Sequence, residues 1–336
     1  MQIYLTFDYE LYFGARTGSL QKCILEPSRM LMDVARRHAI RFCMFVDVGY
    51  LLRLEQESKI HPQLEQDLTD LTAQLDQLVK EGHDLQLHIH PHWEDSHFDG
   101  QAWHCDVTRY KLSDFDDQSI HRIISSYKNR LEQITGKGKV FAFRAGGWCI
   151  QPFERLKEAM HANGIKVDSS VFPGGFFHSE HYDYDFRKAP RSSIWRFNSD
   201  PVIPEDNGNF IELPISSIRQ SPLFYWKLFL LGRLFPHFHK PLGDGQPIPA
   251  PGQRFEILTR YTTQTVSADG YNAQSLQRAL NMATSKSASD LVVIGHPKAL
   301  SRFSIHKLEA FIERNKSTHT FTTFLDQENR LCPSVF

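Results

Sequence analysis

Three histidines alternate along one short stretch of the chain, LHIHPHW at residues 87–93. Imidazole is a common ligand for divalent metals, and three so close together favour a metal site over three unrelated histidines. His88 and His92 are four residues apart, so either a strand end or a turn can bring both to one ion. If the segment stays extended, His90 faces the same way. A turn at Pro91 would instead make His90 a substrate contact or a partner of a ligand.

Two carboxylates, Asp8 and Glu10, follow a hydrophobic run at Ile3–Phe7. Residues two apart on an extended segment point to the same side, so both acids can share one site. Beside a metal, one carboxylate can bind the ion while the other takes a proton from bound water, whose pKa a zinc ion brings to about 7. The residues leave open which acid takes which role.

Apolar runs of β type alternate with helical periodicity. Predicted strands are 3–7, 41–46, 84–89, 140–143, 165–167 and 291–294, and predicted helices are 27–38, 63–80, 118–134, 151–163 and one ending near 315. Such units favour an α/β fold, either a (β/α) barrel or a doubly wound sheet, with functional groups at the carboxyl ends of the strands. The polar residues that end or follow these strands are Asp8, His88, Arg144, Asp168 and His296.

The length of 336 residues fits one barrel domain over 1–336, with an insertion at about 172–253 where aromatic, proline-rich and glycine-rich sequence breaks the rhythm. The 38 Lys and Arg balance 39 Asp and Glu, for a net charge of −1, so no basic field indicates nucleic acid. No basic region leads into an apolar segment at the N-terminus, and the five cysteines show no Cys-x-x-Cys pair. We therefore expect a cytoplasmic protein with reduced thiols.

Residues 223–235 form a strongly apolar, aromatic segment interrupted only by Lys227 and Arg233. It is shorter than the roughly 20 residues that cross a bilayer. We expect a buried helix or a lid over the substrate, because isolated apolar helices are usually core. The alternative is an interfacial helix that makes peripheral contact with the inner face of the membrane.

Five motifs in this order resemble those of the NodB-type polysaccharide deacetylases, carbohydrate esterase family 4. They are TFD at 6–8, GHD at 82–84 with His88 and His92, FRAGGW at 143–148, VDSS at 167–170 and IGHP at 294–297. The resemblance implies a distorted (β/α)7 barrel in which a divalent metal, commonly Zn2+, activates water to remove the N-acetyl group of an aminosugar. The Asp-x-Glu and His-x-His-Pro-His-Trp patterns resemble a divergent branch connected with bacterial surface polysaccharide synthesis.

The resemblance also implies roles for individual residues. Asp8 is the general base, Arg144 orients Asp8, and His296 is the general acid, which Asp168 tunes. His88 and His92 are metal ligands. The proposed substrate contacts are His90, Trp93 and Trp148, of which the two tryptophans are equally compatible with the core.

The chain departs from the family at one ligand, because Tyr9 stands where the family has a second aspartate. Glu10, on the same face as Asp8, is the natural replacement. The metal site is then Glu10, His88 and His92 with Asp8 as base, or the same site with the two acids exchanged.

We expect a metal-dependent hydrolase that removes an N-acyl group, in the first place acetyl, from an aminosugar or glycan precursor that is free, polymeric, nucleotide-linked or lipid-linked. Two alternatives remain open. One is a catalytically inactive or metal-free barrel that binds a sugar or another partner, which the missing aspartate makes plausible. The other is a related hydrolase of non-sugar amides.

Overall fold

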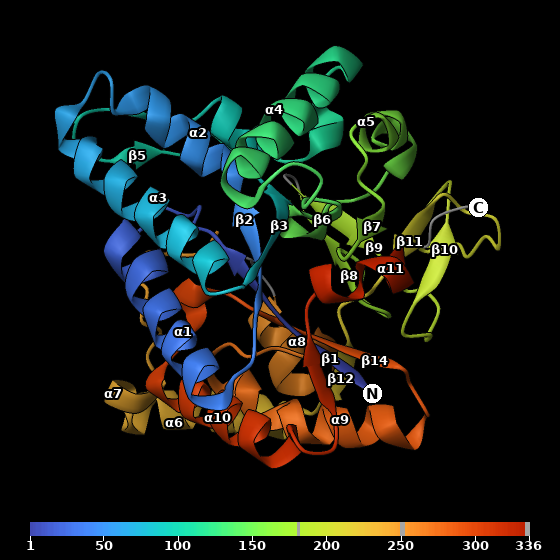
Figure 1. The fold of residues 1–336 in the computed structure, drawn as a ribbon. Coiled ribbons are helices and arrows are strands. Elements are labelled where there is room, and N and C mark those ends of the chain that lie inside the picture. Colours follow the sequence, from blue (N-terminus) through green and yellow to red (C-terminus); the bar gives the residue numbers. More distant parts are fainter. Residues whose placement is uncertain (180–181, 249–252, 333–336) are drawn as a thin grey trace. The chain divides into compact units, whose positions relative to one another are not determined.

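The computed structural model describes residues 1–179, 182–248 and 253–332, which form two compact units (Figure 1). The first unit contains residues 1–40 and 215–321, and the second contains 41–214 and the chain from 322. The described residues do not include 180–181 and 249–252 of the predicted insertion, or 333–336 of the predicted domain. The predicted insertion therefore contributes to both units.

The first unit is built on a pair of parallel strands, β1 and β14, with helices packed around them. Its strands are β1 (Gln2–Tyr9), β12 (Ser217–Gln220), β13 (Thr262–Thr265), β14 (Asp290–Gly295) and β15 (Thr320–Thr322). Its helices are α1 (Glu26–His38), α6 (Pro222–Leu234), α7 (Pro236–His239), α8 (Gln253–Thr259), α9 (Leu276–Ser285) and α10 (Arg302–Asn315). β12 and β13 form an antiparallel pair, and β15 pairs with β1.

The pairing of β1 with β14 brings the polar residues at the ends of these two strands to the same place. Every residue of β1 from Ile3 to Tyr9 is buried, as expected for a parallel strand covered on both faces. In the register, Phe7 lies opposite Gly295. Because the strands are parallel, Asp8 and His296 leave the sheet at the same edge.

The second unit contains a longer, mainly parallel sheet. Its strand order is β10-β11-β7-β6-β3-β2, and only β10 runs antiparallel to its neighbour. The strands are β2 (Cys43–Asp47), β3 (Asp84–Ile89), β6 (Ala142–Ala145), β7 (Val167–Asp168), β10 (Trp195–Phe197) and β11 (Phe210–Glu212), with the hairpins β4 (His97–Phe98) and β5 (Trp103–His104), and β8 (Phe176–His178) and β9 (Asp183–Asp185).

The helices of this unit are α2 (Val48–Glu57), α3 (Glu65–Lys80), α4 (Asp117–Thr135), α5 (Lys157–Ala162) and α11 (Glu328–Leu331). Three of them, α2, α3 and α4, contact β3, and Figure 1 shows them grouped beside it. The start of α4 is set locally, since the Asp116 side chain accepts a hydrogen bond from Ser119 N, and the helix ends at Gly136. Along the sheet, His88 lies opposite both Asp47 and Arg144, and Asp168 lies opposite Phe143 and Glu212.

The α/β class and most predicted elements are confirmed. Two expectations from the sequence are wrong. The helix predicted at 151–163 is confined to Lys157–Ala162 after a 3-10 turn at Phe153–Arg155, and the segment 223–235 is not a buried helix. Helices α2 and α9 were not predicted. Within α6 only Tyr225 is buried. Among the described residues, no helix combines the length and the apolar character needed to cross a membrane.

Candidate active site

An acid-base cluster lies at the carboxyl ends of β1 and β14 in the first unit. His296 directly follows β14, and its Nδ1 donates a hydrogen bond to Asp269 Oδ2 over 2.7 Å. Its backbone N–H donates to Asp269 Oδ1, also over 2.7 Å. The other ring nitrogen, Nε2, lies 3.6 Å from Asp8 Oδ2 and 3.8 Å from Glu10 Oε1. The predicted general acid therefore stands beside both predicted carboxylates.

The surroundings of His296 favour its protonated form. Burial alone lowers the pKa of the imidazole, but Asp269, followed by Asp8 and Glu10, outweighs burial and raises this pKa from 6.5 to about 9. A histidine held in this way carries a proton at neutral pH and can give it to a leaving amine.

Glu10 has a second cationic neighbour, Lys298. The Lys298 ammonium donates to Glu10 Oε1 over 2.8 Å and to the backbone carbonyl of Leu11 over 2.5 Å. It also lies 4.9 Å from the centre of the Tyr12 ring and 4.8 Å from that of Phe13. Both partners of the ion pair are buried, so the pair fixes the Glu10 carboxylate within the cluster.

Tyr9, which stands where the sequence motif predicts a second aspartate, is buried in the core. Burial raises the pKa of its phenol well above 10.0, against a smaller lowering effect of Arg29. A phenol that keeps its proton is a poor metal ligand. The Glu10 carboxylate therefore fits the role of a metal ligand better than the Tyr9 phenol.

The second unit holds the three histidines, all buried, where β3 ends. A 3-10 helix begins at Pro91, so the segment turns there instead of staying extended. The turn keeps the imidazoles together, with ring centres 4.7 Å apart for His88 and His90 and 5.4 Å apart for His90 and His92. His92 also stacks on Tyr110.

One contact defines the chemistry of His88. Its Nδ1 lies 2.8 Å from the carbonyl oxygen of Arg144, which can only accept, so Nδ1 carries the proton and Nε2 carries the lone pair. Metal-binding histidines commonly donate their second ring N–H to a carbonyl or carboxylate. The histidines therefore fit the divalent metal that the sequence predicts, and which two of the three bind it stays a prediction.

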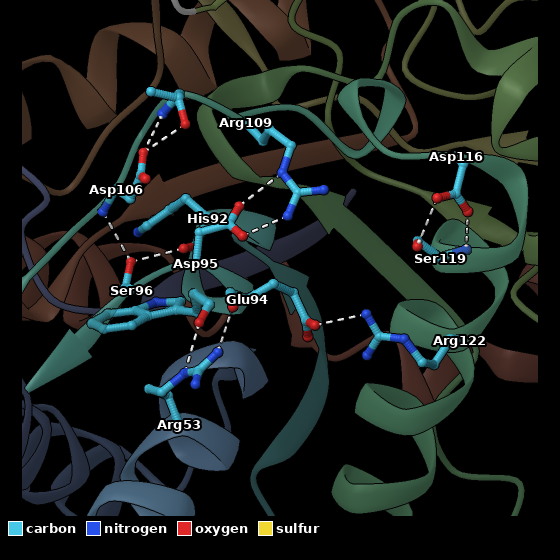
Figure 2. Close-up of polar contacts among 12 residues, drawn as sticks. Arg53, His92, Glu94, Asp95, Ser96, Asp106, Arg109, Asp116, Ser119 and Arg122 are labelled. Atoms are coloured by element: carbon cyan, nitrogen blue, oxygen red, sulfur yellow. Dashed lines mark hydrogen bonds and ion pairs between the residues drawn. The ribbon is translucent and has the colours of Figure 1, made fainter.

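The turn that carries His92 is tied to three arginines, as Figure 2 shows. Arg53 donates to the backbone carbonyls of Trp93 and Glu94, and Arg122 forms an ion pair with the Glu94 side chain at 2.7 Å. Arg109 holds Asp95 through two hydrogen bonds. Arg53 binds the backbone of this turn, and Arg109 and Arg122 bind its side chains. Together these charged hydrogen bonds hold the turn in one conformation.

Arg144 is fully buried next to β7. Its guanidinium donates to the Ser169 backbone carbonyl over 2.9 Å and to Ser169 Oγ over 3.1 Å, and it lies 4.0 Å from the centre of the Phe45 ring. The interaction with Asp8 that the motif implies stays a prediction.

Asp168 forms a pair of buried carboxyl groups with Glu212, its neighbour across β7 and β11. Burial, and then the charge of Asp168, raise the pKa of Glu212 well above 4.5. Burial also raises the pKa of Asp168, although hydrogen bonds from Glu212 and Ser170 lower it. Two adjacent buried carboxyls share a proton, and Glu212 carries it.

The two tryptophans predicted as substrate contacts have different environments. Trp93 is buried among Tyr50 and Trp103, and its indole N–H donates to Asp47 Oδ2 over 2.7 Å. Trp148 is half-buried and has a left-handed backbone, with φ of 61°. A non-glycine residue in that conformation is uncommon and often marks a functional loop. Of the two, Trp148 has the exposure that a sugar contact needs.

Sequence reasoning missed three residues of these clusters: Asp269, Lys298 and Glu212. Asp269 had a weak signal, since it follows the β-type run 262–266 and precedes Gly270, as a strand-end acid does. Lys298 lies two residues after His296, in the same loop as the fifth motif. Glu212 lies within the predicted insertion, where no strand was expected.

Comparisons with known proteins support the fold. No protein-family model matches the sequence, and no curated protein matches it. Among solved structures, a polysaccharide deacetylase from Mycobacterium smegmatis is 14% identical, with a TM-score of 0.51 over 98% of this chain and 89% of that one. Puue allantoinase is 12% identical, with a TM-score of 0.51 over 99% of this chain and 91% of that one.

A third structure, the 4-alpha-glucanotransferase from Thermococcus litoralis, is 11% identical, with a TM-score of 0.51 over 99% of this chain and 41% of that one. At these identities the similarity concerns the fold and leaves the reaction open. The predicted fold class is confirmed, because the chain shares its fold with a solved structure named as a polysaccharide deacetylase.

Proposed function

We propose that this protein is a metal-dependent hydrolase that removes an N-acyl group, in the first place acetyl, from an aminosugar used in a bacterial surface polysaccharide. The observation that carries the proposal is the hydrogen bond of 2.7 Å between His296 and Asp269, with Asp8 at 3.6 Å from the opposite ring nitrogen. Amide hydrolysis needs a base for the attacking water and an acid for the leaving amine. Asp8 and His296 supply both.

The roles follow from charge and position. His296, held in its protonated form by Asp269, gives its Nε2 proton to the amine nitrogen as the C–N bond breaks. Asp8 takes a proton from the attacking water. Glu10, held by its ion pair with Lys298, serves as the carboxylate ligand in place of the family's aspartate.

We assign the metal ligands as the motifs imply, Glu10 with His88 and His92. When bound, a divalent ion such as Zn2+ would polarise the amide carbonyl and make the attacking water more acidic. The Arg144 carbonyl orients His88 by accepting from Nδ1. Trp148 is the candidate surface for a sugar ring, and His90 a further substrate contact.

Metal content is the first test. Purified protein supplied with zinc should bind about one ion per chain, and a His88→Ala/His92→Ala double variant should lose it. A matched control is His97→Ala/His104→Ala, which removes two exposed histidines of the β4–β5 hairpin and should leave the metal content unchanged. A folded wild-type chain that stays empty would reject the metal mechanism and favour a metal-free protein that binds a sugar or another partner.

Acetate release is the second test. The metal-loaded protein should release acetate from some member of a panel of N-acetylated sugars, presented free, nucleotide-linked, lipid-linked or polymeric. Asp8→Asn should bind the metal and lose most of the turnover, since it removes the base and keeps the shape of the side chain.

A second candidate is a hydrolase of non-sugar amides. The structure named as an allantoinase matches this chain with the same TM-score as the polysaccharide deacetylase. Allantoin and other non-sugar amides therefore belong in the substrate screen. Hydrolysis of one of them, with no acetate from any sugar, would favour this candidate.

A further inference from the structure

The first unit exposes an apolar surface that the proposed reaction does not use. It consists of Leu223, Trp226, Leu230 and Leu234 of α6, followed by Phe235 and Phe238, and we call it the α6–α7 surface. The four α6 side chains are 58–61% exposed. Exposed apolar patches of this kind are rare on soluble proteins without a partner.

The spacing places these four side chains together. Leu223, Trp226, Leu230 and Leu234 are three or four residues apart, so they share one face of the helix. Lys227 lies on the same face, and Arg233 lies at its border. The face therefore combines large apolar groups with two cations at its sides.

The opposite face fixes α6 to its own unit. The Tyr225 hydroxyl lies 3.1 Å from Thr262 Oγ1, and the Phe224 ring packs against Tyr271 with ring centres 5.1 Å apart. Similarly, His239 of α7 packs on Phe303 of α10 at 4.6 Å, and Figure 1 shows α7 beside α10. The contacts on one side of α6 thus hold the helix on its unit. The apolar side chains on its other side are exposed although the helix is packed in place.

The segment that carries the α6–α7 surface has charges of one sign, and α8, which packs against α6, adds one exposed carboxylate, Glu256, beside the exposed Arg260. From residue 213 to 243 the chain contains no Asp or Glu, but it contains Arg219, Lys227, Arg233 and Lys240. The whole chain is nearly neutral, with a net charge of −1, so this is a local concentration of positive charge. Exposed Lys and Arg side chains can lay their methylene groups along apolar surface and still reach negative groups.

We propose that the α6–α7 surface binds to an anionic lipid bilayer, with α6 lying in the plane of the interface. Its 13 residues extend only about 20 Å, less than the roughly 30 Å of a hydrocarbon core, which excludes spanning. Leucines and a tryptophan would enter the boundary of the acyl chains, while Lys227 and Arg233 meet lipid phosphates.

A second copy of the chain fits this surface less well. A two-fold interface brings the same patch of both copies together. Lys227 and Arg233 would then approach their own equivalents, and residues 213–243 offer no carboxylate to neutralise them. Anionic headgroups supply the missing negative charge. The inference stands apart from the proposed chemistry, because vesicle binding is measured without a substrate.

The test is sedimentation of the full chain with vesicles of phosphatidylcholine alone and of phosphatidylcholine mixed with phosphatidylglycerol. We expect binding to the mixed vesicles that weakens as salt is added. Leu230→Ser should weaken it roughly tenfold, because it removes one aliphatic side chain that would enter the bilayer. Lys227→Glu/Arg233→Glu should abolish the preference for the anionic lipid. Ile60→Ser is the control, because it removes an exposed apolar side chain in the second unit and should bind as the wild type.

Each variant is checked for folding by circular dichroism and for mass by sedimentation velocity. Wild-type protein that stays in the supernatant with both kinds of vesicle would overturn the proposal. Binding that Leu230→Ser and Ile60→Ser reduce equally would also overturn it. A concentration-dependent dimer that Leu230→Ser dissociates, without vesicle binding, would assign the surface to a second copy of the chain.

Discussion

Asp269 accepts two hydrogen bonds from His296, one from the ring Nδ1 and one from the backbone N–H, both 2.7 Å long. Together they fix the orientation of the imidazole and place the proton of Nδ1 on the side of Asp269. Nε2 faces Asp8 at 3.6 Å, and in the proposed reaction it is then the nitrogen that exchanges a proton with the substrate.

We expect Asp269→Asn to lower the turnover roughly 10³-fold while the protein stays folded, because an amide no longer stabilises the imidazolium or its tautomer. Acetate release by the metal-loaded variant is the measurement. Asp33→Asn is a matched control, since Asp33 is an exposed aspartate paired with Arg36 in the same unit. Equal activity of Asp269→Asn and wild type would remove Asp269 from the mechanism.

The sequence predicted His296 and Asp8 but assigned the carboxylate partner of His296 to Asp168. The register of parallel strands explains why these two residues lie close together, because both come at the ends of strands whose apolar runs are plain in the sequence. The partner depends instead on a loop: Asp269 is brought to His296 through backbone pairing of residues 267–268 with β14. Such pairing over a long separation leaves no periodic signal along the chain.

Glu212 provides a prediction about stability and pH. Its pKa is well above 4.5 in the folded protein, so above pH 4.5 the folded state binds a proton that the unfolded chain releases. The contribution of this group to stability is complete below 4.5 and is lost as the pH rises toward the folded pKa. Glu212→Gln removes this titration, and its amide can still donate to Asp168.

We therefore expect Glu212→Gln to be more stable than wild type at about pH 8, by ~1–3 kcal/mol, and no more stable at about pH 4. Urea unfolding at several pH values is the measurement. Exposed Glu154 supplies a control, Glu154→Gln, which should leave the pH dependence unchanged. Parallel curves for wild type and Glu212→Gln would show that Glu212 is ionised in the folded protein.

The element boundaries show where patterns succeed and where they fail. β3 begins and ends at the predicted residues, because its six buried residues form one continuous run between a turn and a proline. In contrast, the apolar character of α6 suggested burial, and the structure exposes most of it. Periodicity and composition report that a helix forms, but what covers each face depends on residues far away in the chain.

Because Lys298 and Glu10 form a buried ion pair, we expect the effect of replacing one of them on the free energy of unfolding to depend strongly on the other. Lys298→Met removes the ammonium and leaves the buried Glu10 carboxylate with one cation fewer, which should cost about 3–5 kcal/mol. Adding Glu10→Gln should recover much of this loss, since the charge that needed a partner is then absent. Urea unfolding of the two single variants and the double variant measures the coupling. Additive effects in this cycle would show that the pair contributes nothing beyond its separate residues.

A substitution at Gly146 tests how closely the histidines of the second unit are packed. A Cβ atom at this position would lie 2.6 Å from His90 Nδ1 and 2.7 Å from the backbone oxygen of Ile89, so His90 and the end of β3 would have to move. We expect Gly146→Ala to lower stability by about 1–3 kcal/mol and to weaken zinc binding, because one displaced ring disturbs the others it contacts. Gly232→Ala is the control, since its Cβ would meet nothing within 4 Å and alanine favours the helix. If Gly146→Ala unfolds at the same urea concentration as wild type, the close approach of His90 to the backbone at Gly146 is wrong.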